Sequence, residues 1–211
     1  KTLEEIGRKN IPIQNYAKNR SKCERKGINT YCEMIYGLPD ETLDTFINGI
    51  SSVLKAGQER IQLYAHSLNC GAETATKEYI KKFGFETRFR YQPKYCGTHH
   101  GMSTTEYEEV VVKTNTMSFD DFLKIREVHF FVLLLGSNVF KEFQRILKCT
   151  KFDIALITKL MLSEETLWPA SLKNIMKDFR KACREELLSK KDIKKEINQN
   201  DVEILKKKEM I

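Results

Sequence analysis

One stretch of the chain, residues 31–66, follows a strand and helix pattern that few folds accommodate. The apolar run at 31–36 (YCEMIY) ends in a Gly-Leu-Pro turn, and apolar residues then recur at three- and four-residue steps over 43–54. That spacing predicts an amphipathic helix. Residues 60–66 (RIQLYAH) predict a second strand. The order strand, helix, strand implies parallel pairing through a crossover, and therefore an α/β fold.

Two parallel strands need further strands beside them, because parallel sheets are covered on both faces. We expect the missing strands upstream of this chain or in a partner chain. A weakly helical pattern at 11–26 precedes the first strand. The chain starts at Lys1 without an initiator methionine or a basic-then-apolar leader, so we expect a fragment of a longer protein.

The rest of the chain separates into a connection and a helical region. Residues 71–105 predict a long connection with a short helix at 76–83, and residues 109–113 (EVVVK) predict a short strand. Ser118 is a favourable first residue for the helices that follow. We therefore place a boundary near residue 117, with an α/β part at 1–117 and a helical part with a basic tail at 118–211.

The apolar and cysteine residues indicate a cytoplasmic protein. The longest apolar run, at 130–135, is far shorter than the roughly 20 residues that span a bilayer, and predicts a buried helix. The six cysteines match neither a zinc motif nor a dense disulfide framework: Cys23, Cys32, Cys70, Cys96, Cys149 and Cys183. Free thiols in a reducing compartment fit this spacing best.

The net charge of +7 is concentrated near the C-terminus, where residues 173–208 carry twelve basic and seven acidic side chains. No aromatic residue follows Phe179, so we interpret this segment as a solvated helix face and do not expect a nucleic-acid partner. Trp168, before Pro169, predicts an anchor at a helix entry. The pair His99-His100 could bind a metal, but exposed loop histidines are the simpler interpretation, and we predict no metal ligands.

The segment EMIYGLPDET at 33–42, with the helix and the strand RIQLYAHSL at 60–68, resembles the fifth and sixth strands of radical S-adenosylmethionine (radical SAM) enzymes. GRKN at 7–10, FETRFRYQ at 85–92 and EYEEVVVKTNTMSFDDF at 106–122 resemble the cobalamin-binding branch of that family. The resemblance implies the C-terminal part of a partial (β/α)6 barrel, followed by an α-helical C-terminal region.

The resemblance also implies S-adenosylmethionine, a 4Fe-4S cluster and cobalamin as cofactors. The cluster-binding CxxxCxxC motif does not occur in this sequence, and a 4Fe-4S cluster needs thiolate ligands. We therefore expect the cluster ligands and the cobalamin domain in the missing N-terminal part, and expect this chain alone to be inactive. Asp40 and Cys70 replace a glycine and a proline that are common in the family, so these two loops depart from the family's sequence pattern.

Strand alternation places Glu33 and Ile35 on one face and Cys32 on the other. The resemblance implies that Glu33 and Arg8 bind S-adenosylmethionine, that Ile35 and Ser67 contact its adenine, and that Gly37 lets the chain turn near the nucleotide. From the residues alone, Glu33 could equally be a solvated carboxylate at a sheet edge, and Arg8 a surface charge at a helix entry.

Three polar residues share one face of the second predicted strand, Gln62, Tyr64 and His66. They could line a substrate cavity, or they could be packing residues with incidental hydrogen bonds.

The resemblance predicts part of an enzyme that reductively cleaves S-adenosylmethionine to start radical chemistry on an unknown substrate. The alternative is a non-enzymatic module, either a degenerate half-barrel or a basic helical tail, that docks on a protein or on RNA. A CxxxCxxC motif upstream in the complete reading frame would favour the enzyme.

Overall fold

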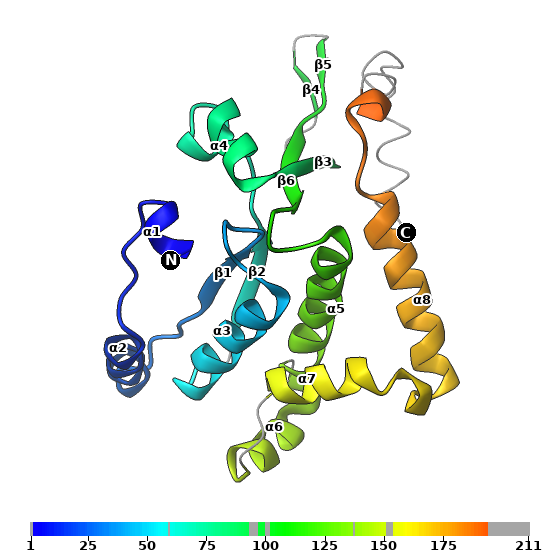
Figure 1. Cartoon of the computed structure of the whole chain (residues 1–211). Helices are drawn as coiled ribbons and strands as arrows, with labels where there is room; N and C mark the ends of the chain where they lie inside the picture. Colours follow the sequence, from blue (N-terminus) through cyan, green and yellow to red (C-terminus); the bar gives the residue numbers. More distant parts are fainter. Residues whose placement is uncertain are drawn as a thin grey trace.

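The computed structural model describes residues 2–58, 60–92, 97–99, 102–136, 138–150 and 154–193 (Figure 1). Its first elements are α1 (Thr2–Glu5), α2 (Ile13–Arg25), β1 (Cys32–Tyr36), α3 (Leu43–Lys55) and β2 (Ile61–Ala65). The helices predicted at 11–26 and 43–54 and the strands predicted at 31–36 and 60–66 are therefore confirmed to within two residues at each end.

β1 and β2 pair in parallel, from Cys32 opposite Ile61 to Tyr36 opposite Ala65. Helix α3 connects them and begins at Thr42, whose side chain forms a capping box with residue 45. α3 buries Phe46, Ile47 and Ile50 in a core that also receives side chains of both strands. The predicted strand, helix, strand unit is thus present.

Residues 71–105 are more structured than the sequence pattern predicted. After η1 (Glu73–Ala75), they form α4 (Lys77–Phe83), β3 (Glu86–Tyr91), β4 (Gly97–His99) and β5 (Met102–Thr104). β4 pairs with β5, and β3 pairs antiparallel with β6 (Tyr107–Lys113), which begins two residues before the predicted strand. The short helix predicted at 76–83 is confirmed by α4, but the rest of the predicted connection contains three strands. Thr87, Phe89 and Tyr91 alternate with charged residues in β3, and this strand pattern was not recognised.

The segment that follows β2 joins the two sheets. The backbone N–H of Leu68 donates to the Glu109 carbonyl at 2.8 Å, and the N–H of Val111 donates to the His66 carbonyl at 2.9 Å. Further along, Leu188 exchanges backbone hydrogen bonds with Phe89. The first two bonds attach β6 to the segment after β2, and the Leu188 bonds attach β3 to the segment after α8 (Ala170–Glu185), in a mixed α/β architecture.

Helix α5 (Phe119–Leu135) follows Ser118, whose hydroxyl accepts the N–H of Asp121 while the Asp121 carboxylate accepts the N–H of Ser118. The predicted helix start is therefore confirmed. The later elements are η3 (Asn138–Phe140), α6 (Lys141–Lys148), α7 (Ile154–Ser163), η4 (Glu165–Leu167) and α8 (Ala170–Glu185). α8 runs alongside α5, and α7 packs against both α3 and α5 (Figure 1).

One hydrophobic core takes side chains from both sides of residue 117. Tyr36 contacts the ring of Phe122 at 5.4 Å between centroids, and Ile125 and Val128 of α5 belong to the same buried cluster as Ile50 and Leu63. Packing of the described residues therefore gives no division at 117. The assignment of 1–117 and 118–211 to two different parts of a larger enzyme stays a prediction.

The apolar run at 130–135 forms the end of α5. Phe131, Val132 and Leu135 are buried, whereas Leu133 and Leu134 are exposed, so only one side of the run is the predicted buried helix. No helix in the described part of the chain has both the length and the apolar character needed to cross a membrane. Trp168 is buried before α8, where its indole N–H donates to the Met161 carbonyl, as expected for a helix-entry anchor. His100 and residues 194–211 lie outside the described residues.

Candidate functional site

The turn at the carboxyl end of β1 favours glycine. Gly37 has φ 87°, and a Cβ there would lie 3.2 Å from the carbonyl oxygen of Val111. Both the positive φ and the close approach disfavour a side chain at this position. Asp40, where the family commonly has glycine, also adopts a left-handed conformation with φ 58°. This loop therefore retains a glycine-like turn although the residue is an aspartate, which tolerates that region better than most side chains.

The carboxylate of Glu41 accepts backbone hydrogen bonds from this turn. Burial raises the pKa of Glu41 to about 7, although the backbone N–H groups of Gly37 and Leu38 donate to its carboxylate and oppose that rise. One carboxylate oxygen, Oε2, is buried without a hydrogen-bond partner among the described residues. Near neutral pH, Glu41 therefore exists in both protonation states.

The two faces of the sheet differ as strand alternation predicted. Glu33 is paired with Gln62, and Ile35 with Tyr64, so these four side chains share one face. Met34, on the other face, contacts the core below α3. Glu33 is exposed, Ile35 is half-buried, and Tyr64 is 47% exposed. The face that carries Glu33 and Ile35 is thus the one that α3 does not cover.

Ser67 lies at the carboxyl end of β2 in a hydrogen-bonded cluster. Its hydroxyl donates to Glu108 Oε1, while Arg90 Nη2 and Gln92 Nε2 donate to Glu108 Oε2 at 2.7 and 2.6 Å. Burial opposes ionisation of Glu108, but the donors Ser67 and Arg90 hold the pKa of this carboxyl below its usual range. Glu108 is therefore an anion that ties the end of β2 to β3 and β6.

His66 lies apart from the other two residues of the predicted polar trio. It is 7% exposed, its Nδ1 lies 3.3 Å from the Gly37 carbonyl oxygen, and its ring meets Phe85 edge-on. Burial lowers the pKa of His66 and outweighs the opposing effect of Gly37, so the ring is neutral at pH 7. His66 supports the turn at Gly37, whereas Gln62 and Tyr64 line a cavity on the other side.

Arg8 is exposed and follows α1. This short helix is attached to α4, because the Tyr79 hydroxyl donates to the Glu5 carbonyl at 3.0 Å and Lys82 pairs with the Glu5 carboxylate at 2.8 Å. The structure thus places Arg8 at the surface, and brings Gly37, Ser67 and His66 together through β6.

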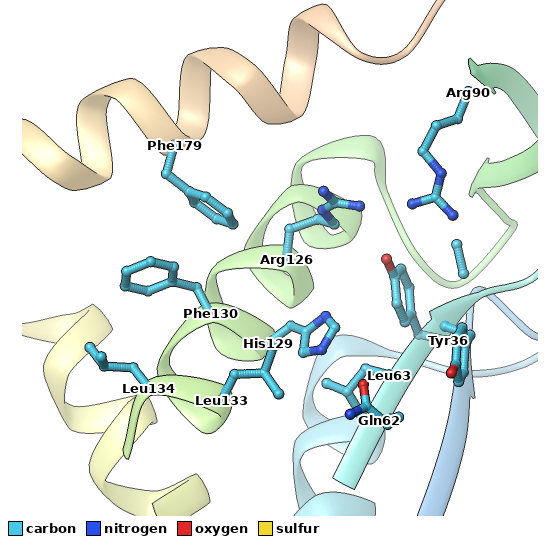
Figure 2. Close-up of a pocket in the computed structure, with 12 residues that line it drawn as sticks. Tyr36, Gln62, Leu63, Arg90, Arg126, His129, Phe130, Leu133, Leu134 and Phe179 are labelled. Carbon is cyan, nitrogen blue, oxygen red and sulfur yellow. The ribbon is translucent and has the colours of Figure 1, made fainter. Parts of the chain in front are cut away.

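A cavity of about 620 Å³ lies beside β2, between α5, α8 and β3 (Figure 2). Four consecutive β2 residues, 62–65, line it, so it runs along the edge of that strand. Its apolar walls are formed by six side chains: Leu63, Ala65, Phe130, Leu133, Leu134 and Phe179.

The same cavity contains six side chains with hydrogen-bonding groups: Tyr36, Gln62, Tyr64, Arg90, Arg126 and His129. Burial alone would lower the pKa of Arg126, but neighbouring Tyr36 and Glu186 raise it overall, so the guanidinium stays charged. Burial, together with Arg126, lowers the pKa of His129 to about 4. The imidazole of His129 is therefore neutral at pH 7.

The sequence prediction found Gln62 and Tyr64 in this cavity but missed its cationic residues. Arg126, His129, Phe130 and Leu133 lie at positions i, i+3, i+4 and i+7 of α5, which is the spacing of one helix face. This mixture of charged and apolar residues on one face of α5 could have indicated that the face lines a cavity. Arg90 could not be found in the same way, because β3 was not recognised as a strand.

The described residues contain no group of three or more His, Cys, Asp or Glu side chains that could hold a metal ion. The five cysteines in this part of the chain are free thiols. Glu33 has an exposed side chain on the face that α3 does not cover, whereas Gly37 is buried against Val111 and His66.

Two known proteins are similar in sequence to more than half of this chain. The cobalamin-dependent radical SAM methyltransferase TokK of Streptomyces tokunonensis is 36% identical over 124 residues, which are 58% of this chain and 18% of TokK. The 2-(S-pantetheinyl)-carbapenam-3-carboxylate methyltransferase of Streptantibioticus cattleyicolor is 37% identical over 123 residues, 57% of this chain and 18% of that enzyme. No protein-family model matches the chain. The chain spans 18% of the length of these two relatives.

Proposed function

We propose that this chain, which is homologous to part of the cobalamin-dependent radical SAM methyltransferases, serves in S-adenosylmethionine-dependent radical methyl transfer. The observation that carries the proposal is the sequence identity of 36–37% to two methyltransferases. The parallel β1–α3–β2 unit with its Gly37 turn is the local structure that the resemblance requires. In the complete protein, β1 and β2 form the last two strands of a partial barrel, and the missing strands pair with the free edge of β1.

S-adenosylmethionine would bind at the carboxyl ends of these strands, as in other barrels of parallel strands. Glu33 would accept hydrogen bonds from the cofactor, Arg8 would contribute a positive charge, and Ile35 and Ser67 would contact the adenine. Gly37 would form the turn after β1, at the end of the strand where the cofactor would lie. The bound cofactor supplies the radical chemistry, and the residues of this chain orient it and exclude water.

The ligands of the 4Fe-4S cluster and the cobalamin domain would come from the N-terminal part of the complete protein. The whole sequence lacks a CxxxCxxC motif, which supports this division of roles. The cavity that contains Gln62 and Tyr64 would hold the substrate. The five cysteines of the described residues are free thiols, which supports a reducing compartment, the cytoplasm, as the location.

The proposal is tested by anaerobic reconstitution of the complete protein with iron, sulfide and cobalamin. After addition of a reductant and S-adenosylmethionine, chromatography should detect 5′-deoxyadenosine in an amount that depends on reduction. Absence of this product from a protein that carries a full cluster would contradict the proposed function.

A further inference from the structure

The cavity beside β2 has two chemically different ends (Figure 2). The guanidinium groups of Arg90 and Arg126 and the hydroxyl of Tyr36 gather at one end. Phe130, Leu133 and Leu134 of α5 lie toward the other end. A ligand that fills the cavity would therefore need a polar group at one end and an apolar body at the other.

The polar end carries two guanidinium groups. Arg126 hydrogen-bonds the Tyr36 hydroxyl, and burial raises the pKa of Tyr36 although Arg126 and Arg90 oppose that rise, so this hydroxyl is neutral at pH 7. Each arginine has a carboxylate partner outside the lining, Glu186 at 2.7 Å from Arg126 and Glu108 at 2.7 Å from Arg90. A guanidinium carries five N–H donors, so one carboxylate contact leaves donors for a ligand. No Asp or Glu is among the described residues that line the cavity.

A buried ring nitrogen supports the presence of a ligand. His129 Nε2 is buried and has no hydrogen-bond partner among the described residues. A buried polar atom without a partner costs free energy, on the order of 1–3 kcal/mol, unless a ligand or water satisfies it. His129 lines the cavity one helical turn after Arg126, so a ligand held by Arg126 can reach the His129 ring.

The apolar end would stabilise the bound ligand by burying its apolar part. Leu133 is 45% exposed and Leu134 is 36% exposed, although both lie on a helix that otherwise packs into the core. With Phe130 and Phe179 they form an apolar wall that an apolar ligand would remove from water. The volume, about 620 Å³, is within the range of sites for small organic molecules.

We propose that this cavity binds an organic carboxylate with an apolar body, whose carboxylate lies against Arg90 and Arg126 and whose apolar part lies against α5. Arginine is suited to this role because its planar fork matches a carboxylate with two parallel hydrogen bonds. The assignment of this ligand as the substrate rests on the proposed function. Binding itself rests only on the cavity.

The test uses octanoate as the probe, and titrates the purified full chain by isothermal calorimetry at pH 7. Octan-1-ol has the same apolar body without the charge, and propionate has the carboxylate with only a short body. Octanoate should bind at least about tenfold more tightly than either compound, because a charge-assisted hydrogen bond and apolar burial both contribute. Equal affinities for octanoate and octan-1-ol, or no binding of octanoate, would overturn the proposal.

Two arginines of β3 give a matched pair of variants. Arg90 lines the cavity, whereas Arg88 is exposed on the same strand and outside the lining. Arg90→Gln should weaken octanoate binding without changing octan-1-ol binding, because Arg126 alone would then hold the carboxylate, and Arg88→Gln should leave both affinities unchanged. Equal effects of the two substitutions would contradict the assigned charge contact.

Leu133→Ser tests the apolar end at an exposed position where folding is not at risk. It should weaken octanoate and octan-1-ol about equally, and thermal unfolding should show that all three variants remain folded. A Leu133→Ser variant with unchanged affinity for both probes would contradict the assigned apolar contact. Failure of the complete protein to bind S-adenosylmethionine would refute the proposed function but would leave this result intact.

Discussion

Arg90 Nη2 lies 2.7 Å from Glu108 Oε2, and the other oxygen of the same carboxylate accepts the hydroxyl of Ser67. Glu108 thus links Arg90, which lines the cavity, to Ser67, which belongs to the proposed S-adenosylmethionine site. Both contacts depend on the ionised carboxylate, because a carboxylate accepts these hydrogen bonds with both oxygens.

Glu108→Gln should lower the free energy of unfolding at pH 7 by about 1–3 kcal/mol, since it weakens charge-assisted hydrogen bonds at a half-buried position. The pKa of Glu108 lies below its usual range in the folded chain, so its contribution is present above the unfolded pKa and is lost as pH falls through the folded value. Urea unfolding at pH 7 and pH 3.5 should show a difference between wild type and variant that shrinks in acid. Glu78→Gln, at an exposed position of α4, is the control.

Glu41 should give the opposite pH dependence. Its folded pKa of about 7 lies above the ordinary carboxyl value of 4.5, so the folded chain binds more protons and loses stability as pH rises from about 5 to 7. Glu41→Gln should remove this loss, which is on the order of 2–3 kcal/mol. Urea unfolding at pH 5.5 and 8 measures it. An identical pH slope in wild type and variant would contradict the raised pKa.

Truncation after residue 117 should remove cooperative unfolding. The chain 1–117 would lose Phe122, Ile125 and Val128 from the core that contains Tyr36, and the edges of its parallel sheet would stay open. Thermal unfolding followed by circular dichroism should be broad and should begin at low temperature. A sharp transition at high temperature would show that the two sides of the boundary fold independently.

The isolated 211-residue chain should carry no iron-sulfur cluster after anaerobic reconstitution with iron and sulfide. Its cysteine spacing contains no CxxxCxxC, and its described residues hold no group of ligands for a metal. Iron analysis and visible absorption measure the outcome. Brown protein with stoichiometric iron would contradict the argument from cysteine spacing.

The strand, helix, strand unit could be predicted from sequence because each of its elements has a regular apolar period. Alternation placed Glu33 opposite to Met34, and the structure confirms that the two side chains lie on different faces. The capped start of α5 was equally visible, since Ser118 and Asp121 form a local pattern. These features depend on neighbours within a few positions.

The cavity could not be predicted because it depends on distant contacts. Arg90, Arg126 and Phe179 come from β3, α5 and α8, which lie together only in the folded chain. His66 shares strand parity with Gln62 and Tyr64, but the chain turns toward β6 after Ala65, and the ring lies near Gly37 and Phe85. Parity along a strand does not extend past its last residue.

The central claim, that the uncovered face of β1 binds S-adenosylmethionine, is tested by the affinity of the complete enzyme for this cofactor. Glu33→Gln keeps the side-chain shape and removes the charge, so affinity measured by equilibrium dialysis should fall about ten- to a hundredfold. Cys32→Ser changes the neighbouring residue, which contacts Tyr16 on the other face, and should leave the affinity nearly unchanged. Equal effects of the two substitutions, or no effect of Glu33→Gln, would contradict the account.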